Sequence, residues 1–311
     1  MRAGLSAALT EINKHSRELR YGMSSQLLIQ TLANAVVVSG MYALIAVGLT
    51  LAFGIMQMAN LAHGHFFMVG AYVVYALYAL SGWPFWFAVA AATVIGALIG
   101  IVVERGIFRP LRGDVVAGFI ATAGLMFVFD VFVGEMWGWG LSRPVPNPYM
   151  RAVRFMGAAV AFQRVIVIPF AFLSIGGLIF FMRRFRLGQA LRAVAQDPET
   201  ASIQGIKINN MTALAMAIAG GLAGLAGGLM STVYAITPSL GHHVILPALI
   251  VVVVGGMGSI GGVTIAAVLF GFIITFVTTL VDGVAATMVS VSIMAVVLAI
   301  RPKGIMGHAI D

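Results

Sequence analysis

The chain has 311 residues, of which 61% are apolar and only 9% are charged, and its mean hydropathy is +1.04. A soluble domain of this length needs roughly a quarter of its residues charged to cover its surface, so composition excludes an ordinary soluble protein. The lack of cysteine excludes disulfides and thiolate sites. The net charge of +8 is dispersed between apolar runs, so we expect membrane lipid around the chain and no nucleic-acid partner.

Three regions are predicted along the chain. Residues 1–25 form an N-terminal amphipathic or surface segment, because basic residues and two glutamates are spread through modest apolar sequence. The order of charge and apolar residues there is not that of a cleavable signal peptide. Residues 26–305 form one transmembrane domain, and residues 306–311 form a C-terminal tail. No loop has the length or patterning of a second domain.

Nine apolar runs follow the N-terminal segment, and most reach the roughly 20 residues that a helix needs to cross a bilayer. They cover residues 26–54, 60–80, 83–103, 115–137, 161–182, 209–236, 244–258, 259–281 and 284–300. The first run could be a broken pair, and the short seventh could be re-entrant. We therefore expect an all-α polytopic bundle of about eight to ten transmembrane helices, with broken helices.

Three basic clusters predict which loops are cytoplasmic. They consist of Arg105, Arg109 and Arg112; of Arg183, Arg184, Arg186, Arg192 and Lys207; and of Arg301 and Lys303. The aromatic link Trp83-Pro84-Phe85-Trp86 fits the opposite interface. Counting the membrane crossings from these loops also places residues 138–164 outside, although they hold four arginines. The side of the N-terminus stays open.

Motifs of catalysis are absent from the sequence. A P-loop needs a glycine-rich run ending in Lys-Ser or Lys-Thr, but Lys14, Lys207 and Lys303 are followed by His, Ile and Gly. No His-Glu-x-x-His or Gly-x-Ser-x-Gly motif occurs either. We expect no catalytic residue, no metal ligand and no cofactor bound by this chain.

A first polar patch interrupts the apolar sequence at Asn60, His63, Gly64 and His65. Polar residues at membrane depth are costly and usually face a bundle interior or a watery cavity. We interpret the patch as a helix break that lines a solute pathway. The alternative is that these residues only end a helix in the headgroup zone.

A second patch, residues 255–262, holds five glycines in eight positions. Each glycine costs a helix about 1 kcal/mol relative to alanine, so a break or a tight turn is expected. Paired helix breaks are one way to build a binding site at the membrane midplane. We therefore assign Gly255, Gly256, Gly258 and Ser259 to the same pathway, against the alternative of a simple close-packed turn.

The polar stretch 188–207 predicts two short cytoplasmic helices. Asp197 can cap the second helix, Pro198 suits its first position, and Glu199 puts negative charge in its first turn. Gly205 can end it. We interpret the stretch as a docking site for a soluble partner, the alternative being a surface helix without one. The candidate coupling residues are Arg192, Gln196, Asp197, Pro198, Glu199, Ala201 and Gly205.

Isolated polar residues leave several alternatives open. Asp130 in the fourth run could be a proton or cation site, or it could pair with a neighbouring helix or lie near an interface. Glu104 is expected to pair with Arg105. Asp282 marks a short loop, and His242 and His243 mark a helix start near the external surface.

Taken together, the patches resemble the permease subunits of branched-chain amino-acid ABC importers of the high-affinity leucine/isoleucine/valine type. The resemblance spans residues 26–305 and rests on residues 48–56 (GLTLAFGIM), 60–64 (NLAHG), 69–72 (VGAY), 192–199 (RAVAQDPE), 205–206 (GI) and 255–262 (GGMGSIGG). Gly188-Gln189-Ala190 departs from the family, which more often has arginine after the glycine.

The resemblance implies a permease domain in the bacterial inner membrane that carries branched-chain amino acids or similar small polar solutes inward. It also implies a second permease subunit, identical or homologous, two cytoplasmic ATP-binding subunits that use ATP-Mg, and a periplasmic solute-binding protein. By this analogy residues 197–205 dock the ATPases, and the Asn60 and Gly255 regions border the pathway.

Three other functions are possible for such a sequence. Importers of urea and short amides, or of aromatic and organic acids, have similar permeases. An ion-coupled secondary transporter would need ionisable groups along its path, for which Asp130 is the one good candidate. A channel is disfavoured because no charged ring or carbonyl filter sequence is visible.

Overall fold

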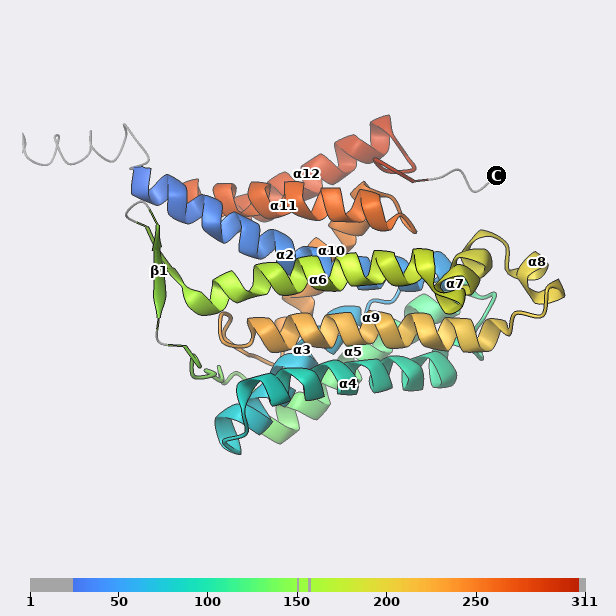
Figure 1. Cartoon of the computed structure of the whole chain (residues 1–311), viewed down its shortest axis with the longest axis horizontal. Helices are drawn as coiled ribbons and strands as arrows, with labels where there is room; N and C mark the ends of the chain where they lie inside the picture. Colours follow the sequence, from blue (N-terminus) through green and yellow to red (C-terminus); the bar gives the residue numbers. More distant parts are fainter. Residues whose placement is uncertain (1–24, 150, 156–157, 308–311) are drawn as a thin grey trace, which may run out of the picture.

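The computed structural model describes residues 25–149, 151–155 and 158–307 (Figure 1). The elements in chain order are α2 (Ser25–Met56), α3 (His63–Val74), the π-helical turn η1 (Tyr75–Leu80), α4 (Phe85–Val103), a second π-helical turn η2 (Glu104–Phe108), α5 (Val115–Trp137), β1 (Ala152–Phe155), β2 (Ala158–Ala161), α6 (Phe162–Arg184), α7 (Arg186–Gln196), α8 (Pro198–Ile203), α9 (Ile208–Met230), α10 (Leu240–Gly255), α11 (Ile260–Leu280) and α12 (Gly283–Ile300).

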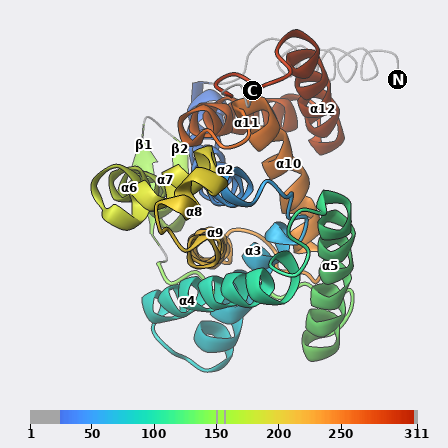
Figure 2. The ribbon, with the colours of Figure 1, turned by 90° about the vertical axis from the view of Figure 1, so that its right-hand side faces the viewer.

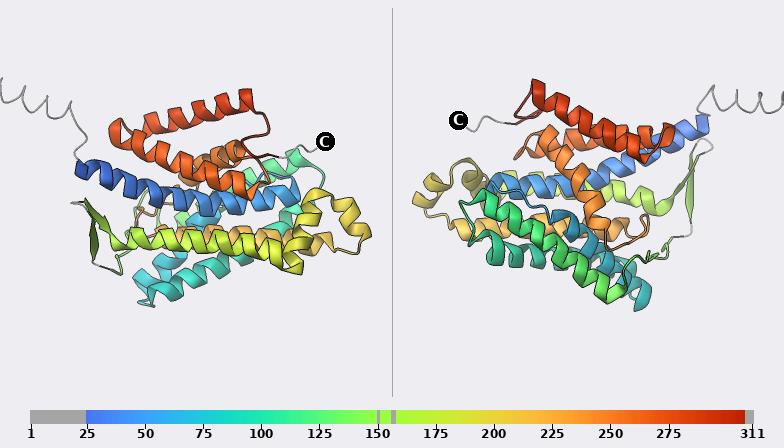
Figure 3. Two further views of the ribbon diagram at one scale, coloured as in Figure 1. Left: turned by 45° about the horizontal axis from the view of Figure 1, so that its top comes forward. Right: turned by 180° about the vertical axis from the view of Figure 1, so that it is seen from behind.

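Eight helices in the described residues are long and apolar enough to cross a membrane, and α10 is a ninth apolar helix of only 16 residues. The predicted helical membrane fold is therefore confirmed. The first run is one unbroken helix, α2, so the alternative of a broken pair is wrong. At 1.5 Å per residue α10 is about 24 Å long, and it crosses the bundle obliquely (Figure 3).

The three basic clusters lie at one end of the bundle, the end that carries α7 and α8, which we call the basic end (Figure 1). The start of α2, the Trp83 link and the β1–β2 hairpin lie at the opposite end. The antiparallel hairpin, in which Ala152 pairs with Ala161, was not predicted from the sequence. Because α2 crosses once, Ser25 lies at the end opposite the basic end. The predicted N-terminal segment itself falls almost wholly on residues 1–24, outside the described residues.

Glycines set the centre of the bundle, where α9 lies among α2, α3 and α4 (Figure 2). A Cβ atom added at Gly220 would collide with the Gly96 carbonyl oxygen of α4, and one at Gly227 with the Phe67 carbonyl oxygen of α3. Lipid provides no hydrophobic drive for helix association, so membrane helices gain stability from such close backbone approach. Accordingly, 72% of the most apolar 18-residue stretch of α9 is buried, against 11% of the corresponding stretches of α5 and α12.

Glu104 shows where the sequence prediction was wrong. Its carboxylate is fully buried and pairs with Arg109 Nη2 at 2.8 Å, not with the adjacent Arg105, which is exposed. The π-helical turn η2 causes this, because its five-residue hydrogen bond from Arg109 N to Glu104 O brings the two side chains to one face. Thr212 of α9 donates to the same carboxylate at 2.8 Å, so the pair joins α4 to α9 at the basic end.

The predicted C-terminal tail begins inside the packed bundle. The amide of Met306 donates to the Gly255 carbonyl oxygen at 3.2 Å, next to a bond from Ile305 N to Val254 O at 2.8 Å. Residues 305–306 therefore donate hydrogen bonds to the last carbonyl groups of α10. Residues 308–311 of the tail lie outside the described residues.

Replacing Gly220 with leucine is expected to destabilise the protein strongly. Inserting extra methylene groups into a well-packed core costs about 1–3 kcal/mol, and here the collision is with backbone, which cannot rotate away as a side chain can. The measurement is the apparent melting temperature of the detergent-solubilised protein by size-exclusion chromatography after heating. Gly177→Leu is the matched control, because Gly177 is exposed on α6 and an added Cβ meets nothing within 4 Å. Equal melting temperatures for the two variants would contradict the packing argument.

Candidate functional site

The first polar patch lies in the interior of the bundle, in the irregular segment 57–62 and the start of α3. Asn60 is 1% exposed, and neither atom of its side-chain amide is hydrogen-bonded to a described residue. His63 is fully buried and its Nε2 lies 3.2 Å from the Ile45 carbonyl oxygen of α2. The predicted break between α2 and α3 is thus present, and Asn60 and His63 are buried in it.

Two glycines bring α3 and α10 together beside this break. A Cβ atom added at Gly64 would collide with the Gly241 carbonyl oxygen, and one at Gly241 would lie 2.8 Å from Cγ of His65. Each glycine directly precedes a histidine, His65 on α3 and His242 on α10. The close approach therefore places the two imidazole rings 4.8 Å apart, edge to face.

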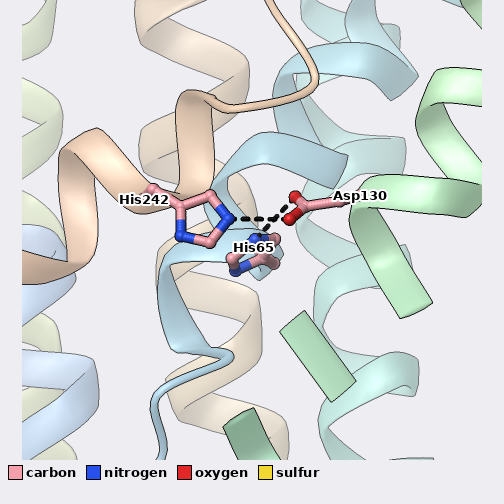
Figure 4. Close-up of side chains that lie close together, drawn as sticks. All are labelled: His65, Asp130 and His242. Atoms are coloured by element: carbon pink, nitrogen blue, oxygen red, sulfur yellow. Dashed lines mark hydrogen bonds and ion pairs between the residues drawn. The ribbon is translucent and has the colours of Figure 1, made fainter. Parts of the chain in front are cut away.

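Asp130 of α5 completes a cluster with these histidines (Figure 4). His65 Nε2 lies 2.9 Å from one carboxylate oxygen, and His242 Nε2 lies 2.7 Å from the other. Of the alternatives that the sequence left open for Asp130, pairing with neighbouring helices is confirmed. The sequence did not predict the cluster, because its members are separated by 65 and 112 residues and only the fold brings them together.

The second patch forms the tight turn that was expected between α10 and α11. Gly256 and Gly258 adopt φ of +101° and +87°, a region that favours glycine. The amide of Gly258 donates to Thr50 Oγ1 at 2.9 Å, and Ser259 caps α11 by accepting from Gly262 N at 3.2 Å. The turn thus packs against the last turns of α2, the helix that leads into the Asn60 break.

The predicted docking stretch forms α7 and α8 at the basic end (Figure 2). Asp197 caps α8 as expected: its carboxylate accepts from the amides of Glu199 at 2.9 Å and Thr200 at 3.1 Å, and also from the Thr200 hydroxyl. The Thr200 hydroxyl above all, together with these amides, holds the pKa of Asp197 below its ordinary value. Pro198 is the first helical residue, and Gly205 ends the stretch at φ +82°.

Exposure separates the predicted coupling residues into two groups. Ala201 is buried at 2% exposure and holds α8 to the bundle. The others are exposed, namely Arg192, Gln196, Asp197, Pro198, Glu199 and Gly205. One residue that we did not assign stands out: Ile203, at the end of α8, is 87% exposed. An isoleucine in a polar stretch was the available sequence signal for it.

Comparison with known proteins settles the family. Residues 31–300 match the family model described as the permease component of branched-chain amino acid transport systems. The chain belongs to this permease family. The resemblance drawn from the sequence motifs is thereby confirmed.

Individual relatives agree with the permease assignment over nearly the whole chain. The high-affinity branched-chain amino acid transport system permease protein BraD of Pseudomonas aeruginosa is 31% identical, covering 90% of this chain and 96% of BraD. LivH of Escherichia coli K12, with the same description, is 32% identical, covering 92% of this chain and 98% of LivH. LivM of the same strain is 25% identical, covering 73% of this chain and 59% of LivM. Among solved structures, PsaBC from Streptococcus pneumoniae in complex with Fab has a TM-score of 0.49 at 14% identity, covering 88% of this chain and 92% of that one.

Removing the Asp197 cap from the permease is expected to loosen α8. In Asp197→Ala the amides of Glu199 and Thr200 lose their acceptor, so hydrogen exchange over residues 198–204 should become faster. Asp197→Asn keeps an acceptor oxygen and should retain most of the protection. Equal exchange in Asp197→Ala and the wild type would contradict the capping role.

The same cap predicts a pH dependence. A carboxylate with a lowered pKa keeps its hydrogen bonds as the pH falls through the ordinary value of 3.8, and loses them only as the pH falls through its own lower pKa. Exchange protection of α8, corrected for intrinsic rates, should therefore be the same at pH 5 as at pH 7. Loss of protection already above pH 4 would contradict this sign.

Proposed function

We propose that this permease component imports branched-chain amino acids across a bacterial inner membrane as part of an ATP-driven ABC importer. The observation that carries the proposal is the 31–32% identity to BraD and LivH over about nine tenths of the chain. The lack of a P-loop supports ATP-Mg hydrolysis on separate subunits rather than on this chain. Transport rather than catalysis is then its role.

A second permease subunit is part of the proposal. The chain resembles both LivH and LivM of one strain, and each is described as a permease protein of a high-affinity branched-chain amino acid transport system. This double resemblance supports a core of two related subunits. The sparsely buried faces of α5 and α12 are available to lipid and to such a partner. A periplasmic solute-binding protein would deliver solute to the end opposite the basic end.

The ATP-binding subunits would dock on α7 and α8. These short helices project from the basic end (Figure 2). Arg192, Glu199 and Ile203 on them are exposed, so two charges and an apolar side chain are available to a partner. An exposed apolar side chain within a polar surface suits the buried centre of an interface, where a few such residues supply most of the binding energy. Nucleotide-driven closure of the ATPases would pull on α8, and Ala201 would transmit that movement into the bundle.

The solute pathway would pass the two breaks that flank the end of α2. Asn60 offers an amide donor and acceptor that no described residue uses, and His63 lies beside it. Gly64, Gly255, Gly256 and Gly258 would border the pathway by allowing the close backbone packing around the two breaks, with Ser259 and His65 as further polar contacts. The unsatisfied amide supports this location, because a buried amide without a partner costs about 1–3 kcal/mol unless something pairs with it in the working cycle.

Two measurements on one strain test the importer proposal. Deleting the gene should abolish ATP-dependent uptake of radiolabelled leucine, isoleucine or valine by the native cells, and the tagged full-length chain should restore it. The tagged chain, solubilised from native membranes, should co-purify with ATP-binding subunits identified by mass spectrometry. Normal leucine uptake with loss of urea or organic-acid uptake would overturn the substrate. Uptake that persists without ATP-binding partners would overturn the ABC mechanism.

Ile203 provides a sharper test of docking. Ile203→Asp should abolish solute-stimulated ATPase activity of the assembled importer and reduce co-purified ATPase at least tenfold, because a charge would be desolvated in the interface. Ile203→Leu keeps the apolar contact and should be close to the wild type. Both variants should insert and elute normally, since the side chain touches solvent and not the core. Full ATPase coupling in Ile203→Asp would exclude this docking surface.

A further inference from the structure

His65 belongs to the proposed solute pathway, but that pathway does not explain why Asp130 and His242 contact His65. The three side chains come from three different helices, α3, α5 and α10, and each contributes one possible metal-ligand atom (Figure 4). All three atoms lie within 4.8 Å of one another. The sequence predicted no metal ligand, because it has no His-Glu-x-x-His motif, and Asp130 was a candidate cation site only as an isolated residue.

We propose that His65, Asp130 and His242 form a binding site for a divalent transition-metal ion of the Zn²⁺ type. Two imidazole nitrogens and one carboxylate oxygen are a donor set that Zn²⁺ binds at about 2.0–2.2 Å. In a tetrahedral site such ligand atoms are about 3.3 Å apart. His65 Nε2 and His242 Nε2 lie 2.9 Å and 2.7 Å from different oxygens of Asp130, and the three ligand atoms lie within 4.8 Å of one another. Side-chain rotations of the exposed His242 and of Asp130 would bring them to this spacing.

Most of the site lies inside the protein, so an ion that binds there must exchange most of its water ligands for these side chains. His65 is fully buried and the Asp130 side chain is 14% exposed, so two of the three ligands are held inside the protein. The His242 side chain is 40% exposed and marks the side from which an ion enters. A fourth ligand, such as water, can bind from that side, as in zinc sites with three protein ligands.

The surrounding packing holds two of the ligands in place. The Gly64–Gly241 contact fixes α3 against α10, and Phe129 of α5 stacks on the His65 ring at 6.2 Å between centroids. By contrast, only 11% of the most apolar 18-residue stretch of α5 is buried. A bound ion would therefore join α5 more firmly to the α3–α10 pair, and its removal would weaken that attachment.

Zinc binding to the purified full-length chain tests the site directly. The protein is purified with a tag free of histidine, stripped with EDTA, and titrated with ZnCl₂ by isothermal calorimetry in detergent. We expect one ion per chain, and a rise in melting temperature on adding Zn²⁺. Co²⁺ in the same site should give the strong visible absorption of a tetrahedral ion.

Matched variants decide whether these residues hold the ion. His242→Ala and Asp130→Asn should weaken Zn²⁺ binding at least tenfold and abolish the stabilisation by Zn²⁺. His243→Ala is the control, since it removes the adjacent exposed histidine, which is outside the cluster. If Asp130→Asn does not fold, the more exposed His242 still decides the result. No stoichiometric binding, or equal affinities in His242→Ala and His243→Ala, would overturn the proposal whatever solute the permease carries.

Discussion

The close approach of α9 to α3 and α4 is the contact on which the rest of the bundle depends. Glycine faces glycine at Gly96 and Gly220, and backbone faces backbone at Phe67 and Gly227. In a lipid solvent this replaces the hydrophobic core of a soluble protein, because apolar side chains gain nothing by leaving lipid for protein. Once α3, α4 and α9 are fixed in this way, the break before α3 and the stretch that leads into α9 have fixed positions too.

Two acidic residues inside this frame have their charge paired by neighbouring side chains. Glu104 is buried with Arg109 and Thr212 at the basic end, and the partly buried Asp130 is hydrogen-bonded between two histidines. A charge in such surroundings is tolerated only when it is paired. Asn60 is the exception among the residues of the first patch, because both polar atoms of its side chain lack a partner in the described chain.

Local signals in the sequence were sufficient for much of the fold. Apolar run length located the spans, since the bilayer imposes it, and Asp197 with Pro198 predicted the start of α8, since capping depends on adjacent residues. The partner of Glu104 was missed because a π-helical turn changes which side chains share a face. The His65, Asp130 and His242 cluster was out of reach, because its three residues meet only through the packing of separate helices. The solute pathway through Asn60 and Gly255 stays a prediction.

The uneven burial of the helices has a mechanical consequence. α2 and α9 are embedded on most sides, whereas α5 touches the bundle along a narrow line through Gly118, Phe129, Asp130 and Val133. Helices with few buried contacts open at lower free energy than those at the centre. The α3–α4–α9 core is therefore the part of the molecule that resists deformation. A force applied through a neighbouring subunit would displace α5 before it deformed that core.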